Sequence, residues 1–281
     1  MSRTGLTRRR LLQAGAAAAA GLGFYTWQWE PHWLEVVRLD LPVAHLPSSL
    51  VGRTLVQLSD IHVGPRVADA YLLDVFGQVS ALAPDIVVYT GDLASFRDDG
   101  FYEQVERMYA APPRGRLATL GTCGNHEYGP EWRHPEIADR LVGIAEAGGI
   151  RMLRNAIADV EGLQIVGLDD LWGQRFDGAA ACLALDRSRA MLALSHNPDT
   201  VDLPAWTGFE GWILAGHTHG GQIKPPFLPP PVVPVRNRRY TAGTFDLAAG
   251  RTLYVSRGVG HLFQARFNVR PEVTVFTLQR A

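Results

Sequence analysis

The stretch Leu55-Val56-Gln57-Leu58-Ser59-Asp60-Ile61-His62 places two potential metal ligands directly after a short, largely apolar run. A run of this length that is followed by polar residues predicts a buried strand. Asp60 and His62 are two residues apart, so at the end of a strand both side chains can face one ion. The segment therefore predicts a strand that delivers metal ligands at its carboxyl end.

Four later segments repeat this arrangement. They are Asp85–Thr90 before Gly91-Asp92, Leu117–Thr122 before Gly124-Asn125-His126-Glu127, Ala190–Leu194 before Ser195-His196-Asn197, and Trp212–Ala215 before Gly216-His217-Thr218-His219. In open α/β sheets the carboxyl ends of parallel strands meet at one crevice, where sites are built. Imidazole, carboxylate and amide ligands suit divalent cations such as manganese, iron or zinc. Because a carboxylate has two oxygens, Asp92 can bridge two ions, and we expect a site that holds two.

Strand and helix patterns alternate along the rest of the chain. Helices are expected at Val67–Ala81, Phe101–Ala111 and Pro135–Ala147, and further strands at Leu34–Leu41, Arg151–Leu153, Leu163–Leu168, Arg251–Ser256 and Glu272–Leu278. The proline-rich run Pro225–Pro234 can form neither a central strand nor a helix, so it is expected to be a loop. With no repeat and no interior linker, residues 34–281 are predicted to form one α/β domain of two sheets packed face to face, with helices outside.

The composition sets limits on the partners of this protein. A formal net charge of -1 over 281 residues provides no overall field for nucleic acid, so no nucleic-acid partner is expected. Cys123 and Cys182 are too few for a disulfide framework or a thiolate metal site, and a single bridge between them stays open.

The first residues have the features of an export segment. Thr7-Arg8-Arg9-Arg10-Leu11-Leu12-Gln13 precedes a weakly apolar stretch rich in alanine and glycine, and the pattern resembles a twin-arginine signal. We therefore expect residues 1–27 to be a signal that engages the twin-arginine export machinery and directs the domain to the periplasm or cell envelope. The alternative is an uncleaved membrane anchor, because Leu11–Trp27 has the minimum length for crossing a bilayer.

The five motifs together resemble a known enzyme family. Asp-x-His, Gly-Asp, Gly-Asn-His-Glu, a lone His and Gly-His-x-His occur in this order between Thr54 and Gly221, as in the calcineurin-like metallophosphoesterase superfamily. Residues Gly220–Ile223, Val255–Gly260 and Arg270–Val273 are similar to its bacterial YaeI/YkuE-like branch. This resemblance implies a β-sandwich of two mixed sheets flanked by helices around two divalent ions of open identity. It assigns Asp60, His62, Asp92 and His219 to the first ion, and Asp92, Asn125, His196 and His217 to the second.

Three positions next to the ligands have predictions of their own. His126 follows ligand Asn125, so it should point into the same pocket and protonate or polarise the leaving-group oxygen. Glu127 is expected to support the loop rather than bind metal. Ser95 departs from the family pattern, since it stands where the second motif usually has another Asp, with Asp98 or Asp99 as candidate substitutes. Loss of such a supporting carboxylate typically weakens metal binding about 10- to 100-fold.

The expected function is that of a binuclear metal-dependent phosphoesterase, most readily a phosphodiesterase. The apolar loop Pro225–Val233, followed by Arg236, Arg238 and Arg239, would suit a phospholipid or lipid-linked substrate at a membrane surface of the bacterial envelope, although a stiff loop packed on the domain is equally compatible. The alternatives are a lipid A precursor hydrolase resembling UDP-2,3-diacylglucosamine pyrophosphatase, and a non-catalytic metal-binding scaffold. The physiological substrate, the preference for mono- or diesters and the oligomeric state stay open.

Overall fold

The computed structural model describes residues 7–98 and 100–281, and its domain consists of two six-stranded sheets. The first sheet has the order β1-β12-β2-β3-β4-β5. Its strands are β1 (Glu35–Val43), β12 (Glu272–Arg280), β2 (Thr54–Leu58), β3 (Ile86–Thr90), β4 (Ala118–Thr122) and β5 (Arg151–Met152). β2 to β5 run parallel, and β12 pairs antiparallel with β2 and parallel with β1. The carboxyl ends of β2, β3 and β4 therefore lie at one edge of the sheet.

The second sheet has the order β10-β11-β9-β8-β7-β6 and is also mixed. Its strands are β10 (Gly243–Asp246), β11 (Arg251–Val255), β9 (Gly211–Ala215), β8 (Ala190–Leu194), β7 (Leu163–Gly167) and β6 (Ala156–Val160). The four central strands are parallel and the two outer strands, β6 and β10, are antiparallel to their neighbours. The mixed two-sheet sandwich predicted from the sequence is thus confirmed.

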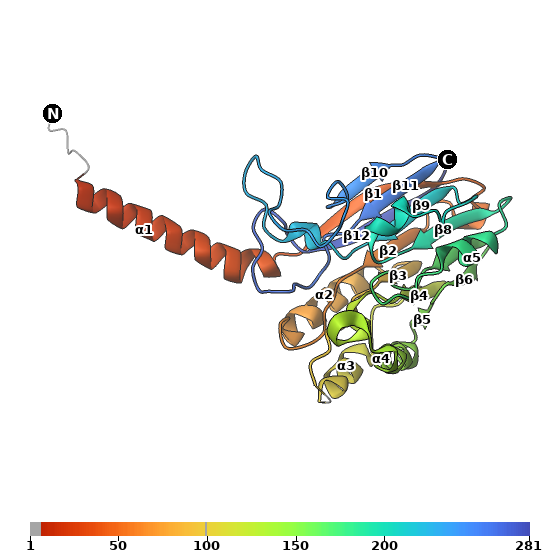
Figure 1. Ribbon diagram of the computed structural model, residues 1–281, viewed down its shortest axis with the longest axis horizontal. Helices are drawn as coiled ribbons and strands as arrows, with labels where there is room; N and C mark the ends of the chain where they lie inside the picture. The colour runs from red at the N-terminus through yellow and green to blue at the C-terminus, as the bar shows by residue number, and fades with distance from the viewer. Residues whose placement is uncertain (1–6, 99) are drawn as a thin grey trace.

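Apolar side chains between and outside the sheets hold the layers together. Leu55 and Val88 of the first sheet share a buried cluster with Ile165, Leu192 and Leu214 of the second. The helices α2 (Asp69–Ala81), α3 (Phe101–Tyr109) and α4 (Pro135–Ala147) cover the outer face of the first sheet, below it in Figure 1, and α5 (Gly178–Leu183) packs on the second sheet. Burial on both faces explains why the central strands read as continuous apolar runs.

The predicted elements occur with small shifts at their ends, and within the domain two strands and one α-helix were not predicted. β6, β10 and α5 lack a strong periodic pattern. β6 and β7 form a hairpin whose two-residue turn, Glu161-Gly162, has positive φ at both positions, as a type I′ turn requires. The glycine at the second turn position was a usable signal for this hairpin. Residues 225–234 form a loop, as predicted.

The amino-terminal segment is helical and projects from the domain (Figure 1). α1 (Arg8–Phe24) continues through the π-helical turn Tyr25–Trp29 to the short 3-10 helix Glu30–His32, and every side chain of α1 is exposed. Within residues 7–98 and 100–281, no helix combines the length and the apolar character needed to cross a bilayer. Residues 1–6 of the predicted signal, and Asp99, lie outside the described residues. Cys123 and Cys182 are both buried and free, so no bridge joins them.

Candidate metal centre

The loops after β2, β3, β8 and β9 bring potential ligands into two groups that share one carboxylate. Asp60, His62, Asp92 and His219 form one group, and Asp92, His196 and His217 form the other, with the ligand atoms of each group within 4.8 Å of one another. The Asp92 carboxylate lies 3.6 Å from His62 Nε2 and 3.2 Å from His196 Nε2. All of these side chains are buried. The first group contains the four residues expected from the sequence, and the second contains three of its expected four, Asp92, His196 and His217.

The backbone is held in an unusual conformation at these positions. Asp60, His62, Asp92, His217 and His219 all have positive φ, between 49° and 71°. Few residues other than glycine adopt this conformation, and clusters of them occur mainly at functional sites. Hydrogen bonds between neighbouring loops maintain it, because the His62 amide donates to the Asp92 carbonyl at 3.0 Å and the His217 amide donates to the Asp60 carboxylate at 2.9 Å. The strand ends therefore present their side chains at fixed directions before any ion binds.

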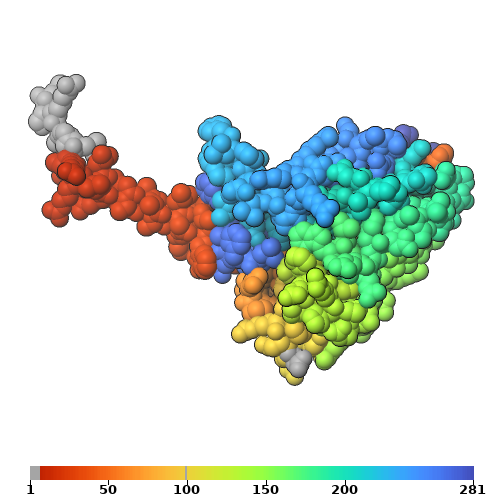
Figure 2. Space-filling model, in the orientation of Figure 1, coloured from red at the N-terminus to blue at the C-terminus, as the bar shows by residue number. Residues whose placement is uncertain are grey.

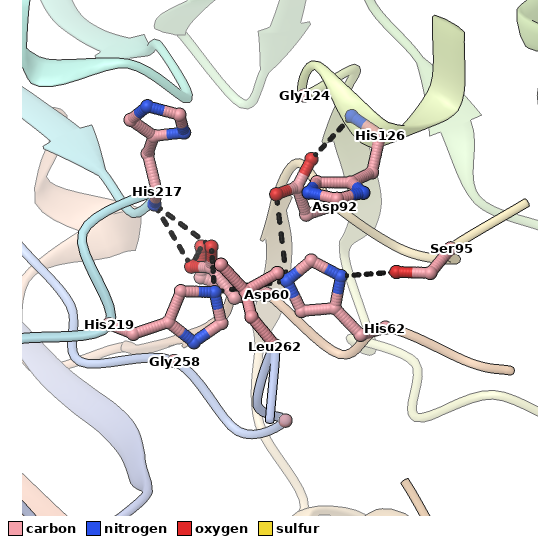
Figure 3. Close-up of polar contacts among 12 residues, drawn as sticks. Asp60, His62, Asp92, Ser95, Gly124, His126, His217, His219, Gly258 and Leu262 are labelled. Carbon is pink, nitrogen blue, oxygen red and sulfur yellow. Dashed lines mark hydrogen bonds and ion pairs between the residues drawn. The ribbon is translucent and has the colours of Figure 1, made fainter. Parts of the chain in front are cut away.

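Three of the four ligand imidazoles are oriented by an oxygen atom that lies within hydrogen-bond distance of one ring nitrogen. His196 Nδ1 lies 2.8 Å from the Thr90 carbonyl, and His217 Nε2 lies 2.8 Å from the Pro234 carbonyl. His62 Nδ1 lies 2.7 Å from the Ser95 hydroxyl, as Figure 3 shows. Such an oxygen acceptor fixes which ring nitrogen carries the proton and leaves the other free for a cation. The nitrogens left free in this way are those that converge on Asp60 and Asp92.

Ser95 thus occupies the supporting position that its place in the second motif implies. We expect Ser95→Ala to weaken metal binding by about 10- to 100-fold, because His62 loses its acceptor, whereas Ser95→Asp should retain or tighten it. Bound metal per chain after dialysis against a graded chelator would measure this effect. Ser188→Ala removes an exposed hydroxyl far from the site and is the matched control. Equal metal retention by Ser95→Ala and the control would contradict a supporting role.

The loop after β4 supplies the remaining candidates. Asn125 Oδ1 is buried and finds no hydrogen-bond partner among the described residues, which is the state expected of an oxygen that serves an ion. Glu127 accepts hydrogen bonds from the backbone amides of Asp92, Ala94 and Gly124, at 2.7 to 3.2 Å. Its carboxylate therefore ties two ligand loops together, as predicted, and stays out of both ligand groups.

Three of the four ligand imidazoles and Asp92 have the protonation state that metal binding needs. Burial lowers the pKa of His62 and His219, and it lowers the pKa of His217 to about 3, so these rings are neutral and keep a free lone pair at neutral pH. Burial would raise the pKa of Asp92, but the positive charge of His196 outweighs it and holds that pKa well below its usual value. Burial disfavours the charged form of His196, but the carboxylate of Asp92 outweighs it and raises the pKa of His196 to about 10, so this ring would release its proton when a cation binds. Two carboxylates with four imidazoles are a donor set that fits a pair of divalent cations.

Glycines allow the loops to close around Asp60. A Cβ atom on Gly216 would lie 1.9 Å from Ser59 Oγ and 2.3 Å from the Asp60 carboxylate. Gly258, at φ +69°, would place a Cβ 2.6 Å from Asp60 Cβ. Both positions therefore require glycine. Gly258 belongs to the motif Val255–Gly260, and its contact with Asp60 could not be predicted from the spacing of residues in the sequence.

His126 stands between the ligands and a surface pocket. Its amide donates to Asp92 at 2.9 Å, and its ring packs edge-on against His62 with ring centres 4.8 Å apart. The ring also lines a pocket of about 580 Å³. The other lining residues are Pro65, Arg66, Ser95, Phe96, Arg97, Gly129, Pro130, Glu131 and Trp132. Two arginines at this opening suit an anionic ligand.

Sequence reasoning missed several groups that shape the centre. The carbonyls of Thr90 and Pro234 orient the imidazoles of His196 and His217. Because every residue has a backbone carbonyl, the residue type does not reveal such a contact. The fully buried Arg266 donates to the carbonyls of Arg257, Gly258 and Gly260, and so holds the segment that packs on Asp60. Asp170, also buried, interacts electrostatically with His196 and Asp92 of the second group, and burial raises its pKa to about 7. Asp170 follows β7 as the other candidates follow their strands, which was the available signal.

A two-sheet sandwich with two ligand groups sharing a carboxylate at its strand ends defines a dimetal hydrolase. Comparison with known proteins agrees, since the Calcineurin-like phosphoesterase family description matches residues 53–221, and the chain belongs to this family. It is 33% identical to Phosphodiesterase YaeI of Escherichia coli over 97% of this chain and 99% of that protein. It is 31% identical to Uncharacterized metallophosphoesterase YkuE of Bacillus subtilis, over 95% and 93%. Identity to UDP-2,3-diacylglucosamine pyrophosphatase LpxG of Chlamydia trachomatis is 28%, over 88% and 91%.

These findings settle the general activity. The protein is a metal-dependent phosphoric ester hydrolase of the calcineurin-like type, in the branch that includes YaeI and YkuE. Such enzymes use two divalent metals, and the clustered Asp and His side chains fit that number. The identity of the metals stays open.

Proposed function

We propose that this enzyme is a phosphodiesterase that uses the two ligand groups around Asp92 and the adjoining pocket to cleave a phosphate diester. The observation that carries the proposal is the shared carboxylate of Asp92, which places the two groups side by side next to His126. When bound, two divalent cations would supply Lewis acidity and activate a water molecule. Asp60 and Asp92 are the only carboxylates among the proposed ligands, so the loaded centre would remain positive and attract an anionic ester.

The chain's own residues would complete the reaction. Arg66 and Arg97 at the pocket opening would bind the phosphate group, and Phe96 and Trp132 would contact the organic part of the ester. His126 would protonate the leaving-group oxygen, since its ring lies between the ligands and the pocket. The side chain of Asp92 and the amide of His126 are hydrogen-bonded, so the proton donor and the shared ligand keep a fixed relation.

The proposal extends to a phospholipid or lipid-linked substrate in the bacterial envelope. It is supported by the exposed apolar side chains of the 225–233 loop and by the Pro234 carbonyl that joins this loop to His217. The twin-arginine pattern at Arg8–Arg10 supports export of residues 34–281 by that machinery, with residues 1–27 acting as the signal or as an anchor in the membrane. A second candidate is pyrophosphate cleavage in a UDP-linked diacylglucosamine, which the similarity to LpxG favours.

A substrate screen on the purified full chain tests this proposal. After its metal content is measured, the protein would be supplied with bis(p-nitrophenyl) phosphate, p-nitrophenyl phosphate, a phospholipid and UDP-2,3-diacylglucosamine. We expect metal-dependent turnover that is faster on the diester than on the monoester and that stops after chelation. Faster turnover of the monoester would overturn the diesterase assignment, and preference for the UDP-linked substrate would favour the second candidate. Metal binding without any turnover would support a scaffold.

A further inference from the structure

Exposed apolar side chains from three distant segments gather at the end of the domain that carries α1. They are Trp27, Trp29 and Trp33 of the first segment, Phe227, Leu228 and Val232 of the second, and Phe263 of the third, each with 46% or more of its side chain exposed. We call these seven residues the apolar collar. Figure 2 shows the second segment, in cyan, as a lobe that rises beside the base of α1. Clustered exposed apolar residues of this kind mark an interaction surface.

Hydrogen bonds join the three segments that carry the apolar collar. The Lys224 amide donates to the Phe267 carbonyl at 2.8 Å, which joins the second segment to the third. The Arg266 amide donates to the Thr26 carbonyl at 3.0 Å, and Gln264 Nε2 donates to the Trp27 carbonyl at 3.0 Å, which joins the third segment to the first. The apolar collar is therefore a built feature of the fold.

The charged residues beside the apolar collar are mostly basic. Between Gly211 and Pro271 the sequence has a single acidic residue, Asp246, although the buried Asp199 accepts from the amides of Arg236 and Asn237 and the exposed Asp202 accepts from the Asn237 side chain. The exposed basic residues of the second segment and its continuation are Lys224, Arg236, Arg238 and Arg239. Arg238 also donates to the Pro230 carbonyl at 2.6 Å, which fastens the loop that carries Phe227. Basic side chains around exposed aromatic and aliphatic groups complement an anionic lipid surface.

The apolar collar also adjoins both the catalytic pocket and α1. His261 Nε2 lies 2.8 Å from the carbonyl of Arg66, a pocket residue, and the Pro234 carbonyl holds His217. On the other side the collar continues into α1, whose exposed residues from Leu11 onward are uncharged. Tryptophans at such a junction match the headgroup level of a bilayer, where amphipathic rings are enriched.

We propose that the apolar collar docks on the surface of an anionic phospholipid bilayer and holds the pocket opening at the level of the lipid headgroups. The occupant is the bilayer itself, because the collar combines continuity with an uncharged exposed helix and a basic rim. This inference rests on the proposed lipid-linked substrate for its purpose, yet docking can be measured without turnover.

Flotation of the full chain with equimolar phosphatidylglycerol and phosphatidylcholine vesicles tests the docking. We expect the wild type to float and the double variant Phe227→Ser/Leu228→Ser to partition at least about tenfold less, because two apolar side chains no longer enter the bilayer. Phe263→Ser, on a different segment, should also partition less. Leu183→Ser is the matched control, since Leu183 is 68% exposed but lies on α5, at the other end of the molecule in Figure 1.

The outcomes separate docking from catalysis. The double variant should keep wild-type turnover of soluble bis(p-nitrophenyl) phosphate, because Phe227 and Leu228 lie outside the ligand groups and the pocket. If Phe227→Ser/Leu228→Ser and Phe263→Ser both floated like the wild type, vesicle binding would be assigned to α1 alone, and the proposed docking by the collar would be wrong. Binding unchanged on pure phosphatidylcholine would overturn the role of the basic rim. Vesicle binding without diester turnover would leave docking standing and defeat the proposed function.

Discussion

Replacing His126 with alanine is expected to lower turnover of an alkyl phosphate diester by about 10²- to 10⁴-fold, the range lost with a general acid. The metal content should persist, because the amide of residue 126 still donates to Asp92 in the variant. The size of the loss should depend on the leaving group. An alkoxide needs protonation as it departs, whereas p-nitrophenolate departs almost as readily without it, so the loss should be much smaller for a p-nitrophenyl ester.

A comparison of the two leaving groups therefore isolates the proton-transfer role. His134→Ala is the matched control, because His134 is a half-exposed histidine of the following segment. Its ring is hydrogen-bonded to Glu136. The control should retain both metal and turnover. An equal loss for the alkyl and p-nitrophenyl esters, or loss of metal from His126→Ala, would assign His126 to binding and remove it from proton transfer.

Changing Asp92 to asparagine is expected to have the largest effect on metal binding. Its carboxylate lies within 3.6 Å of His62 Nε2 and within 3.2 Å of His196 Nε2, so it serves both ligand groups. The variant loses one of two ligand carboxylates and the charge that bridges the groups. We expect at least one of the two metals to be absent. Activity should fall by more than the ~10- to 100-fold that is typical when a residue that only supports a metal ligand is changed.

Metal analysis after purification, together with diester turnover at added metal, checks this expectation. Asp98, a candidate for the supporting carboxylate in the sequence, is instead 64% exposed and paired with Arg97, in the same connection between β3 and α3. Asp98→Asn is therefore the matched control. Two metals and wild-type turnover in Asp92→Asn would remove the shared-ligand assignment. The proposed function would then need a centre built from the remaining side chains.

Most of the fold was predictable because its central strands are buried on both faces. That burial leaves continuous apolar runs such as Ile86–Thr90, and the polar residues that follow mark the strand ends. The two outer strands of the second sheet were not predicted, because they are not buried on both faces. β6 and β10 are short, half-exposed edges whose residue types are set by turns and neighbours rather than by a core.

The local sequence by itself determined the residue types of the candidate ligands, their order and their places at strand ends, because each ligand lies within four residues of the end of its own strand. Only the tertiary structure decided that Ser95 contacts His62, that the Pro234 carbonyl contacts His217, and that Gly258 packs on Asp60. It also decided that Trp27, Phe227 and Phe263 share one surface. These contacts join segments 17 to more than 200 residues apart, and no periodicity or spacing rule carries information over such separations.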